Sequence, residues 1–284
     1  MHAYTGSFTA ADGLTLFTRT YLPDAPAPAA VIISHGYAEH SGRYEALAEA
    51  LVNEGYAVYA LDHRGHGQSG GKRASIRIFK EYVDDLARFI DCVRETRPEP
   101  PRFLLGHSMG GLIALQLVLE HPEKVEGVAV TGALLENAVP VPALLESVAG
   151  LVSALAPDLP VQELRAEDVA RDPAVVKAYK DDPLVYHGKV RARLGYEMLR
   201  AGPFVAGRVH NIELPVMIQH GADDKIAAVG GARALYDALG TDDKTLKLYD
   251  GAYHEVLNDY GREEVIKDLV EWLDVKANLW GAYP

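Results

Sequence analysis

Cysteine is nearly absent from the sequence. Cys92 is the single cysteine among 284 residues, so no intrachain disulfide can support the fold. No uninterrupted apolar run reaches the roughly 18 residues that suggest a membrane-spanning helix. The first residues, MHAYTGSFTAADG, have neither a basic start nor an apolar core, and we therefore expect no signal peptide. Together these features predict a cytoplasmic protein.

Positive charge is also scarce. The chain has 28 Lys and Arg against 40 Asp and Glu, a formal net charge of −12, without any basic cluster. This balance argues against nucleic-acid binding and against attraction to anionic membranes. No H-E-x-x-H motif, Cys/His pair or G-x-x-x-x-G-K-[ST] loop occurs, so we expect neither a metal nor a cofactor. His63 and His66 would be the first candidate ligands if a metal were bound, and no obligate protein partner is evident.

Apolar residues are plentiful, at 48%, and the length suffices for one large domain or one domain with an insertion. Apolar runs predict buried strands, and helix-periodic segments alternate with them. This alternation predicts an α/β fold with a mostly parallel sheet and helices on both faces. Residues 8–10 and 14–21 flank Asp12-Gly13 and predict an antiparallel edge hairpin with a tight turn. The predicted strands are 30–34, 56–61, 125–131, 216–219 and 244–249, and the predicted helices are 43–54, 79–97, 231–239 and 263–275.

The alternation stops between residues 133 and 213, where no convincing strand is found. This gap of about 80 residues is much longer than an ordinary crossover. We therefore predict a helical cap, or lid, inserted between two core segments at 1–132 and 214–284. Residues 143–156 form an apolar stripe at helical spacing, which fits either a helix packed on the core or a lid over an apolar substrate. The stripe comprises Leu144, Leu145, Val148, Leu151, Val152 and Leu155.

Residues 101–120 contain the most informative stretch, an apolar run followed by GHSMG and a helix-forming segment. A G-x-S-x-G pattern between strand and helix is typical of a nucleophile elbow, whose strained turn exposes a serine hydroxyl, here that of Ser108. Gly106 and Gly110 would prevent side-chain collisions where strand and helix meet. The alternative is a glycine-rich turn between two core elements.

A serine nucleophile needs a histidine base and a carboxylate that orients it. In this architecture they follow the serine in the order acid, then histidine, each after a strand. His254 comes after the predicted strand at 244–249, while Asp223 and Asp224 both come after 216–219. The residue types alone do not choose between the two aspartates.

The developing negative charge needs two backbone N–H donors. One is expected from Met109, which follows the serine. The other is expected from Tyr37, in the His35-Gly36-Tyr37 loop after the third strand, where glycine allows close approach. The alternative for His35-Gly36 is a simple turn that ends the strand.

Four motifs and a predicted cap segment, AYKDDPL, resemble the α/β-hydrolase superfamily, and within it the monoacylglycerol lipase and lysophospholipase-like family. The motifs are HGYAEHSGRY, DHRGHGQS, GHSMGG and DKTLKLYDGAYHE. The resemblance covers nearly the whole chain. It implies a catalytic triad and a set of substrate-binding side chains at the glycerol end. The implied triad is Ser108, Asp224 and His254, and the implied binding residues are Glu39, Arg43, His107 and Tyr179. A surface ion pair that steadies the loop is the alternative for Glu39 and Arg43.

The resemblance implies a serine esterase that hydrolyses monoacylglycerols through an acyl-enzyme, with a lipid ester as its small-molecule partner. Transient contact of the cap with a membrane or micelle is compatible with this function. Animal monoacylglycerol lipases carry a second histidine where this chain has Leu257, which leaves a lysophospholipase or a general carboxylesterase as alternatives. A non-catalytic binding protein of the same fold is the alternative from another class, but every expected catalytic position is filled.

Overall fold

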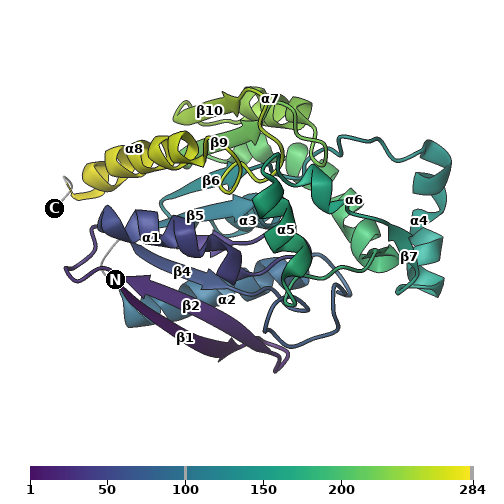
Figure 1. The fold of residues 1–284 in the computed structure, drawn as a ribbon, viewed down its shortest axis with the longest axis horizontal. Coiled ribbons are helices and arrows are strands. Elements are labelled where there is room, and N and C mark those ends of the chain that lie inside the picture. The colour runs from purple at the N-terminus through teal and green to yellow at the C-terminus, as the bar shows by residue number, and fades with distance from the viewer. Residues whose placement is uncertain (99–100, 282–284) are drawn as a thin grey trace.

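The computed structural model describes residues 1–98 and 101–281, in which eight strands form one twisted sheet (Figure 1). The strand order is β1-β2-β4-β3-β5-β6-β9-β10. β1 and β2 are antiparallel, and the other six strands run parallel to one another, as predicted. Their bounds are β1 His2–Thr9, β2 Thr15–Leu22, β3 Ala30–Ser34, β4 Ala57–Leu61, β5 Arg102–His107, β6 Gly127–Thr131, β9 Val216–Gly221 and β10 Lys244–Tyr249.

Helices cover both faces of the sheet, because the central strands are apolar on both sides. In β3, Ile32 packs toward α2 and α3, while Ile33 packs toward α1 and α8. Successive side chains of a strand point to opposite faces, so a continuous apolar run needs a cover on each. The helices are α1 Glu45–Asn53 and α8 Arg262–Gly281 on one face, and α2 Lys80–Thr96, α3 Met109–Glu120 and α7 Val229–Ala238 on the other.

The predicted edge hairpin is confirmed, with two differences. Its turn is longer than two residues, since the Ala10 amide donates to the Leu14 carbonyl at 2.8 Å and Gly13 takes the left-handed conformation at φ 87°. β1 also begins at His2 rather than at residue 8. The early residues of β1 are exposed and mostly polar, so no apolar alternation marked them as a strand.

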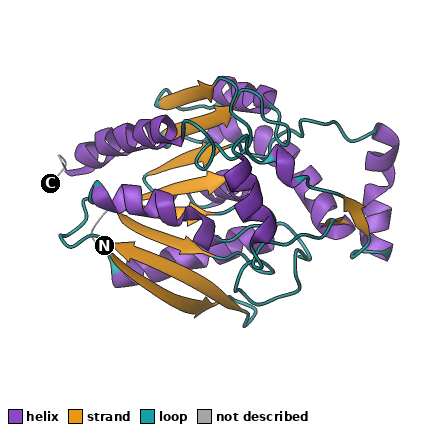
Figure 2. Ribbon diagram, in the orientation of Figure 1, coloured by secondary structure: helices purple, strands orange, loops and turns teal. Residues whose placement is uncertain are grey.

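The segment between β6 and β9, which the sequence predicts to be a cap and which is termed the cap, contains three helices, but the expectation that it lacks strands was wrong. β7 and β8 form a short antiparallel pair that joins Pro160 to Arg191 (Figure 2). Strands this short have no periodicity that a sequence pattern could reveal. The bounds are α4 Ala143–Leu155, β7 Pro160–Gln162, α5 Pro173–Asp181, β8 Val190–Arg191 and α6 Ala192–Ala206.

The apolar stripe on α4 faces outward. Leu144 is 77% exposed, Leu151 62% and Leu155 77%, whereas Ser153 is the buried residue of this helix. Packing of this stripe on the core is therefore excluded, and Figure 1 shows α4 at the outer end of the cap, away from the sheet. Among the described residues no helix, α4 included, is long and apolar enough to cross a membrane.

Candidate active site

The residues singled out from the sequence gather at one edge of the sheet. Ser108 follows β5, Asp224 follows β9 and His254 follows β10. The loop that contains Tyr37 follows β3. The carboxyl ends of parallel strands lie at the same edge, which is where ligands bind in open α/β sheets. The topology therefore brings together groups that are far apart in the sequence.

Ser108 lies in a strained turn between β5 and α3. Its φ of 54° and ψ of −118° are unfavourable for a residue with a side chain, as expected of a nucleophile elbow. The two neighbouring glycines are needed for space. A Cβ on Gly106 would lie 2.5 Å from the Gly110 carbonyl oxygen, and one on Gly110 would lie 2.1 Å from that of Ser34. The predicted strand, turn and helix are confirmed.

The structure places Asp224, and not Asp223, beside His254. Asp224 Oδ2 lies 2.7 Å from His254 Nδ1 and 3.1 Å from His220 Nε2. The other oxygen, Oδ1, accepts hydrogen bonds from the backbone N–H groups of Ile226 and Ala227. The carboxylate is thus fixed on both sides, and its contact makes Nδ1 of His254 the protonated nitrogen. Nε2 is left to act as a base.

The pKa of Asp224 is lowered and the pKa of His254 is raised relative to their usual values. Burial alone would raise the pKa of Asp224, but the charge of His254 and hydrogen bonds from His220 and His254 lower it. Burial alone would lower the pKa of His254, but Asp224 and the nearby Glu255 and Glu39 carboxylates raise it above the usual 6.5. An aspartate that stays ionised beside a histidine with a raised pKa is the arrangement that supports a general base.

Ser108 and His254 line one cavity of about 340 Å³. Both side chains are buried, at 6% and 4% exposure. The polar side chains of the lining also include Glu39, Tyr179 and Glu255. Its apolar side chains are Leu134, Val139, Leu164, Val169, Val190, Met198 and Ile226, among others. A cavity lined by both kinds of side chain suits an ester that has a polar alcohol and an apolar acyl chain.

The loop of Tyr37, the candidate oxyanion donor, is held from three directions. His35 Nδ1 donates to the Gly36 carbonyl at 2.7 Å, and His35 Nε2 accepts from the His63 amide at 2.9 Å, so His35 is a neutral imidazole. The Gly36 amide donates to Glu39 Oε1 at 2.7 Å. The third direction is the cap, from which the Tyr186 amide donates to the Ala38 carbonyl. Met109, the other candidate donor, is the first residue of α3 and directly follows Ser108.

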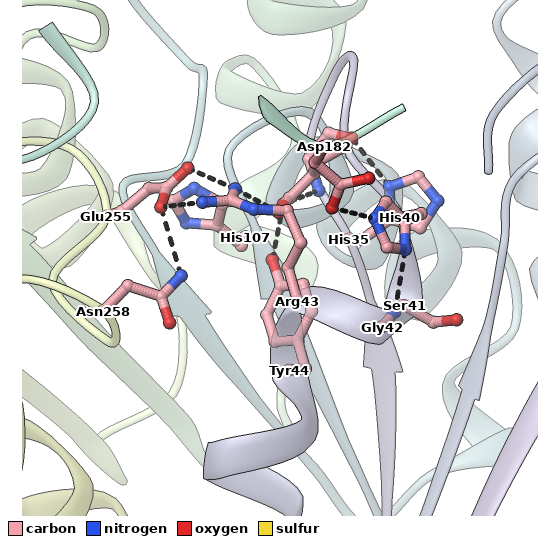
Figure 3. A network of polar contacts seen from close by, with 12 residues as sticks. His35, His40, Ser41, Gly42, Arg43, Tyr44, His107, Asp182, Glu255 and Asn258 are labelled. Carbon is pink, nitrogen blue, oxygen red and sulfur yellow. Dashed lines mark hydrogen bonds and ion pairs between the residues drawn. The ribbon is translucent and has the colours of Figure 1, made fainter. Parts of the chain in front are cut away.

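Glu39 and Arg43 form a buried ion pair rather than the surface pair considered from the sequence. Arg43 Nη1 donates to Glu39 Oε2 at 2.9 Å, and Arg43 also binds Glu255 through both of its terminal nitrogens (Figure 3). Burial would raise the pKa of Glu39, but the charge of Arg43 and a hydrogen bond from Tyr44 lower it to about 2. The carboxylate of Glu39 is therefore already engaged in an ion pair and hydrogen bonds within the protein.

Three of the four substrate-binding residues expected from the resemblance line the cavity. Glu39, His107 and Tyr179 line it, whereas Arg43 lies behind, with its guanidinium 4.8 Å from the Tyr179 ring. Glu255, which also lines the cavity, was missed. Its position next to His254 was the only signal in the sequence, because its contact with Arg43 joins residues that are 212 positions apart.

His63 and His66, the two histidines of DHRGHGQS, are buried among other side chains of the protein. His63 Nε2 lies 2.9 Å from Ser34 Oγ, and the rings of His63 and His66 both pack against Tyr82. Burial lowers the pKa of His63 well below its usual value and that of His66 to about 3. Over residues 1–98 and 101–281, no cluster of three or more His, Cys, Asp or Glu side chains is arranged to hold a metal ion.

Comparisons with known proteins agree with this geometry. The profile of the family described as "Serine aminopeptidase, S33" matches residues 25–261. A monoacylglycerol lipase of Mycolicibacterium smegmatis is 38% identical over 94% of this chain and 95% of its own. A monoglyceride lipase of Rattus norvegicus is 33% identical over 96% and 91%. The crystal structure of Paleococcus ferrophilus monoacylglycerol lipase superimposes with a TM-score of 0.80 at 31% identity, over 97% of this chain and 100% of its own.

Proposed function

The chain belongs to the α/β-hydrolase family of serine aminopeptidase S33, which includes monoacylglycerol lipases, and from this we propose that it hydrolyses monoacylglycerols to fatty acid and glycerol. It is a carboxylic ester hydrolase. One observation carries the proposal more than any other: Ser108, on a strained elbow, and His254, which is paired with Asp224, line one cavity that has both polar and apolar side chains.

In the proposed reaction, Ser108 Oγ attacks the ester carbonyl carbon while His254 Nε2 takes the hydroxyl proton. The carbonyl oxygen becomes an oxyanion, which the backbone N–H groups of Tyr37 and Met109 stabilise. When the C–O bond to glycerol breaks, His254 returns the proton to the leaving oxygen. Water then repeats the sequence on the acyl-enzyme, with His254 as base, and releases the fatty acid. Asp224 stays ionised throughout and stabilises the charged imidazole.

The apolar side chains of the cavity lining supply the affinity for the acyl chain. Each methylene that is buried there contributes about 0.8 kcal/mol. The cap contributes Leu164, Val190 and Met198 to this lining, so acyl-chain preference is set largely by the cap. Polar side chains of the lining, among them His107 and Tyr179, are left for the glycerol.

Transient contact with a lipid surface is the role we assign to α4. Its five exposed apolar side chains form an outward stripe, and an amphipathic helix of this kind can insert shallowly into a lipid interface. These five exposed residues are Leu144, Leu145, Val148, Leu151 and Leu155. Such contact would give the cavity direct access to monoacylglycerol in a membrane or micelle. The cytoplasmic location expected from the sequence stays a prediction.

A substrate panel tests the proposed function. Purified protein would be assayed on monoacylglycerols of several chain lengths, lysophosphatidylcholine, triacylglycerol and short p-nitrophenyl esters, with Ser108→Ala as the control. We expect the highest kcat/KM for monoacylglycerols and loss of all esterase activity in Ser108→Ala. Preference for lysophosphatidylcholine would indicate a lysophospholipase, and activity on short esters alone would indicate a general carboxylesterase.

A further inference from the structure

The polar end of the cavity holds two buried acids and one buried base. Glu39 and Glu255 are 2% and 4% exposed, and both bind the same guanidinium. Arg43 reaches the two oxygens of Glu255 at 2.5 and 2.7 Å (Figure 3). It also donates to Glu39 Oε2 at 2.9 Å. A bidentate contact of this kind is made by an ionised carboxylate. Two carboxylates against one guanidinium leave one negative charge in excess.

The other groups around Glu39 and Glu255 are neutral. Tyr44 Oη donates to Glu39 Oε1 at 2.7 Å, and Asn258 Nδ2 donates to Glu255 Oε2 at 3.1 Å. Tyr179 covers the guanidinium with its ring. Burial lowers the pKa of His107 to about 4, so this imidazole is uncharged at neutral pH. Within the part of the chain that the structure describes, Arg43 is the one cation hydrogen-bonded to either acid.

The charges elsewhere on the cavity wall do not offset this excess. The cavity is also lined by Glu163, Arg165, Asp168 and Lys225, two acids and two bases. Their charges cancel, and Glu163, Arg165 and Lys225 are exposed, so that solvent and salt screen them. His254 is paired with Asp224. The buried carboxylates, which are screened much less, therefore determine the potential at the polar end.

We propose that Glu255 is a specificity-determining residue, which together with Glu39 makes the alcohol end of the cavity negative and so selects esters of neutral polyols over lysolipids that carry a phosphate. This inference rests on the proposed function and defines the substrate class of the same site. Hydroxyl groups of a polyol can donate hydrogen bonds to carboxylate oxygens. A phosphate ester cannot donate when ionised, and two like charges that share a buried site repel each other strongly.

The test compares substrates that differ only in the head group. These are 1-octanoylglycerol, its 3-phosphate and its 3-phosphocholine ester, assayed as monomers below their critical micelle concentrations. For the wild-type protein we expect kcat/KM to fall in the order neutral, zwitterionic, anionic, with at least about a hundredfold between the first and last. Equal or faster turnover of the 3-phosphate would overturn the inference while leaving ester hydrolysis itself intact. No turnover of 1-octanoylglycerol would instead count against the proposed function.

Two variants locate the discrimination. Glu255→Gln removes the excess charge, and Asn258→Lys offsets it by placing a cation beside Glu255. In each, the ratio of kcat/KM for 1-octanoylglycerol to that for the 3-phosphate should fall about tenfold. Glu263→Gln, an equal charge change at an exposed site on α8, should leave the ratio unchanged, and Glu255→Asp should largely keep it. A ratio that stays at the wild-type value in both neutralised variants would overturn the role of Glu255.

The pH profile separates an electrostatic role from a structural one. Glu255 is one of the charges that raise the pKa of His254. Glu255→Gln should therefore move the acidic limb of kcat/KM for 1-octanoylglycerol to lower pH, and Glu255→Asp should restore it. A loss of rate at every pH without movement of this limb would show that Glu255 acts only as a structural support.

Discussion

At the scale of single residues, the site depends on how side chains with ordinary chemistry are held. Asp224 is fixed by two backbone N–H groups and two histidines, so its charge lies where the proposed base needs it. Glu39 is held by Gly36, Arg43 and Tyr44. Asp224 sets the protonation of His254, and Glu39 sets the shape of the loop that contains Tyr37.

Asp224→Asn should lower kcat by about 10⁴, because the amide cannot stabilise a charged imidazole and can favour the wrong tautomer. The wild-type kcat/KM should fall as pH decreases through the raised pKa of His254, since only the neutral imidazole accepts a proton. The variant loses the charge that raises this pKa, so the acidic limb of its residual activity should lie at lower pH. Rate measurements from pH 5 to 9 check both effects, and an acidic limb that does not move would contradict them.

Glu39→Leu distinguishes a binding residue from a positioning residue. The variant removes the acceptor for the Gly36 amide, and we expect the loop of Tyr37 to lose its geometry. Loss of one oxyanion donor typically lowers kcat by about 10²–10³, and we expect a fall of this kind with little change in KM. Glu39→Gln keeps an acceptor for the amide and should retain more activity. A rise in KM at unchanged kcat would instead make Glu39 a glycerol ligand.

At the scale of elements, the β5–α3 junction shows how local strain is accommodated. The strand and the helix meet so closely that Gly106 and Gly110 have no room for a side chain. α3 itself is largely apolar and mostly buried against the sheet, which secures the strained Ser108 at its start. The cap shows the opposite case, since α4 leaves its apolar face without cover.

Gly110→Ala should lower the free energy of unfolding by about 3 kcal/mol or more, because the new methyl group would lie 2.1 Å from the Ser34 carbonyl oxygen and 2.4 Å from that of His35. Gly230→Ala on α7 is the matched control. The nearest atom to its added Cβ, Glu136 Oε2, is 3.6 Å away, so this change should be neutral or slightly stabilising. Urea unfolding of the two variants gives the comparison, and equal stabilities would refute the steric account.

Replacing Leu151 and Leu155 by serine should reduce α4 binding to neutral phosphatidylcholine vesicles about tenfold, because the lipid-facing apolar area is lost. Turnover of monoacylglycerol in vesicles should fall with it, while kcat/KM for a soluble short-chain monoacylglycerol should not change. Val275→Ser, at an exposed apolar position of α8, is the control. Unchanged vesicle binding in the double variant would rule out α4 as the contact.

At the scale of the whole molecule, local patterns in the sequence predicted most of the sheet and the residues at its edge. The apolar run at 30–34 and the GHSMG turn are each formed by neighbouring residues, so a short stretch of sequence is enough to predict them. Contacts that join distant segments left no such pattern: Arg43 with Glu255, or β7 with β8. The exposure of α4 was equally hidden, because an apolar stripe looks the same whether protein or lipid covers it.

The central claim is that monoacylglycerol is hydrolysed through an acyl group on Ser108. The most direct measurement is rapid acid quench of the enzyme during turnover of 1-octanoylglycerol, followed by peptide mass spectrometry. We predict that the peptide containing Ser108 gains one octanoyl group, and that Ser108→Ala shows neither this adduct nor turnover. An octanoyl group on another residue, or turnover that persists in Ser108→Ala, would contradict the account.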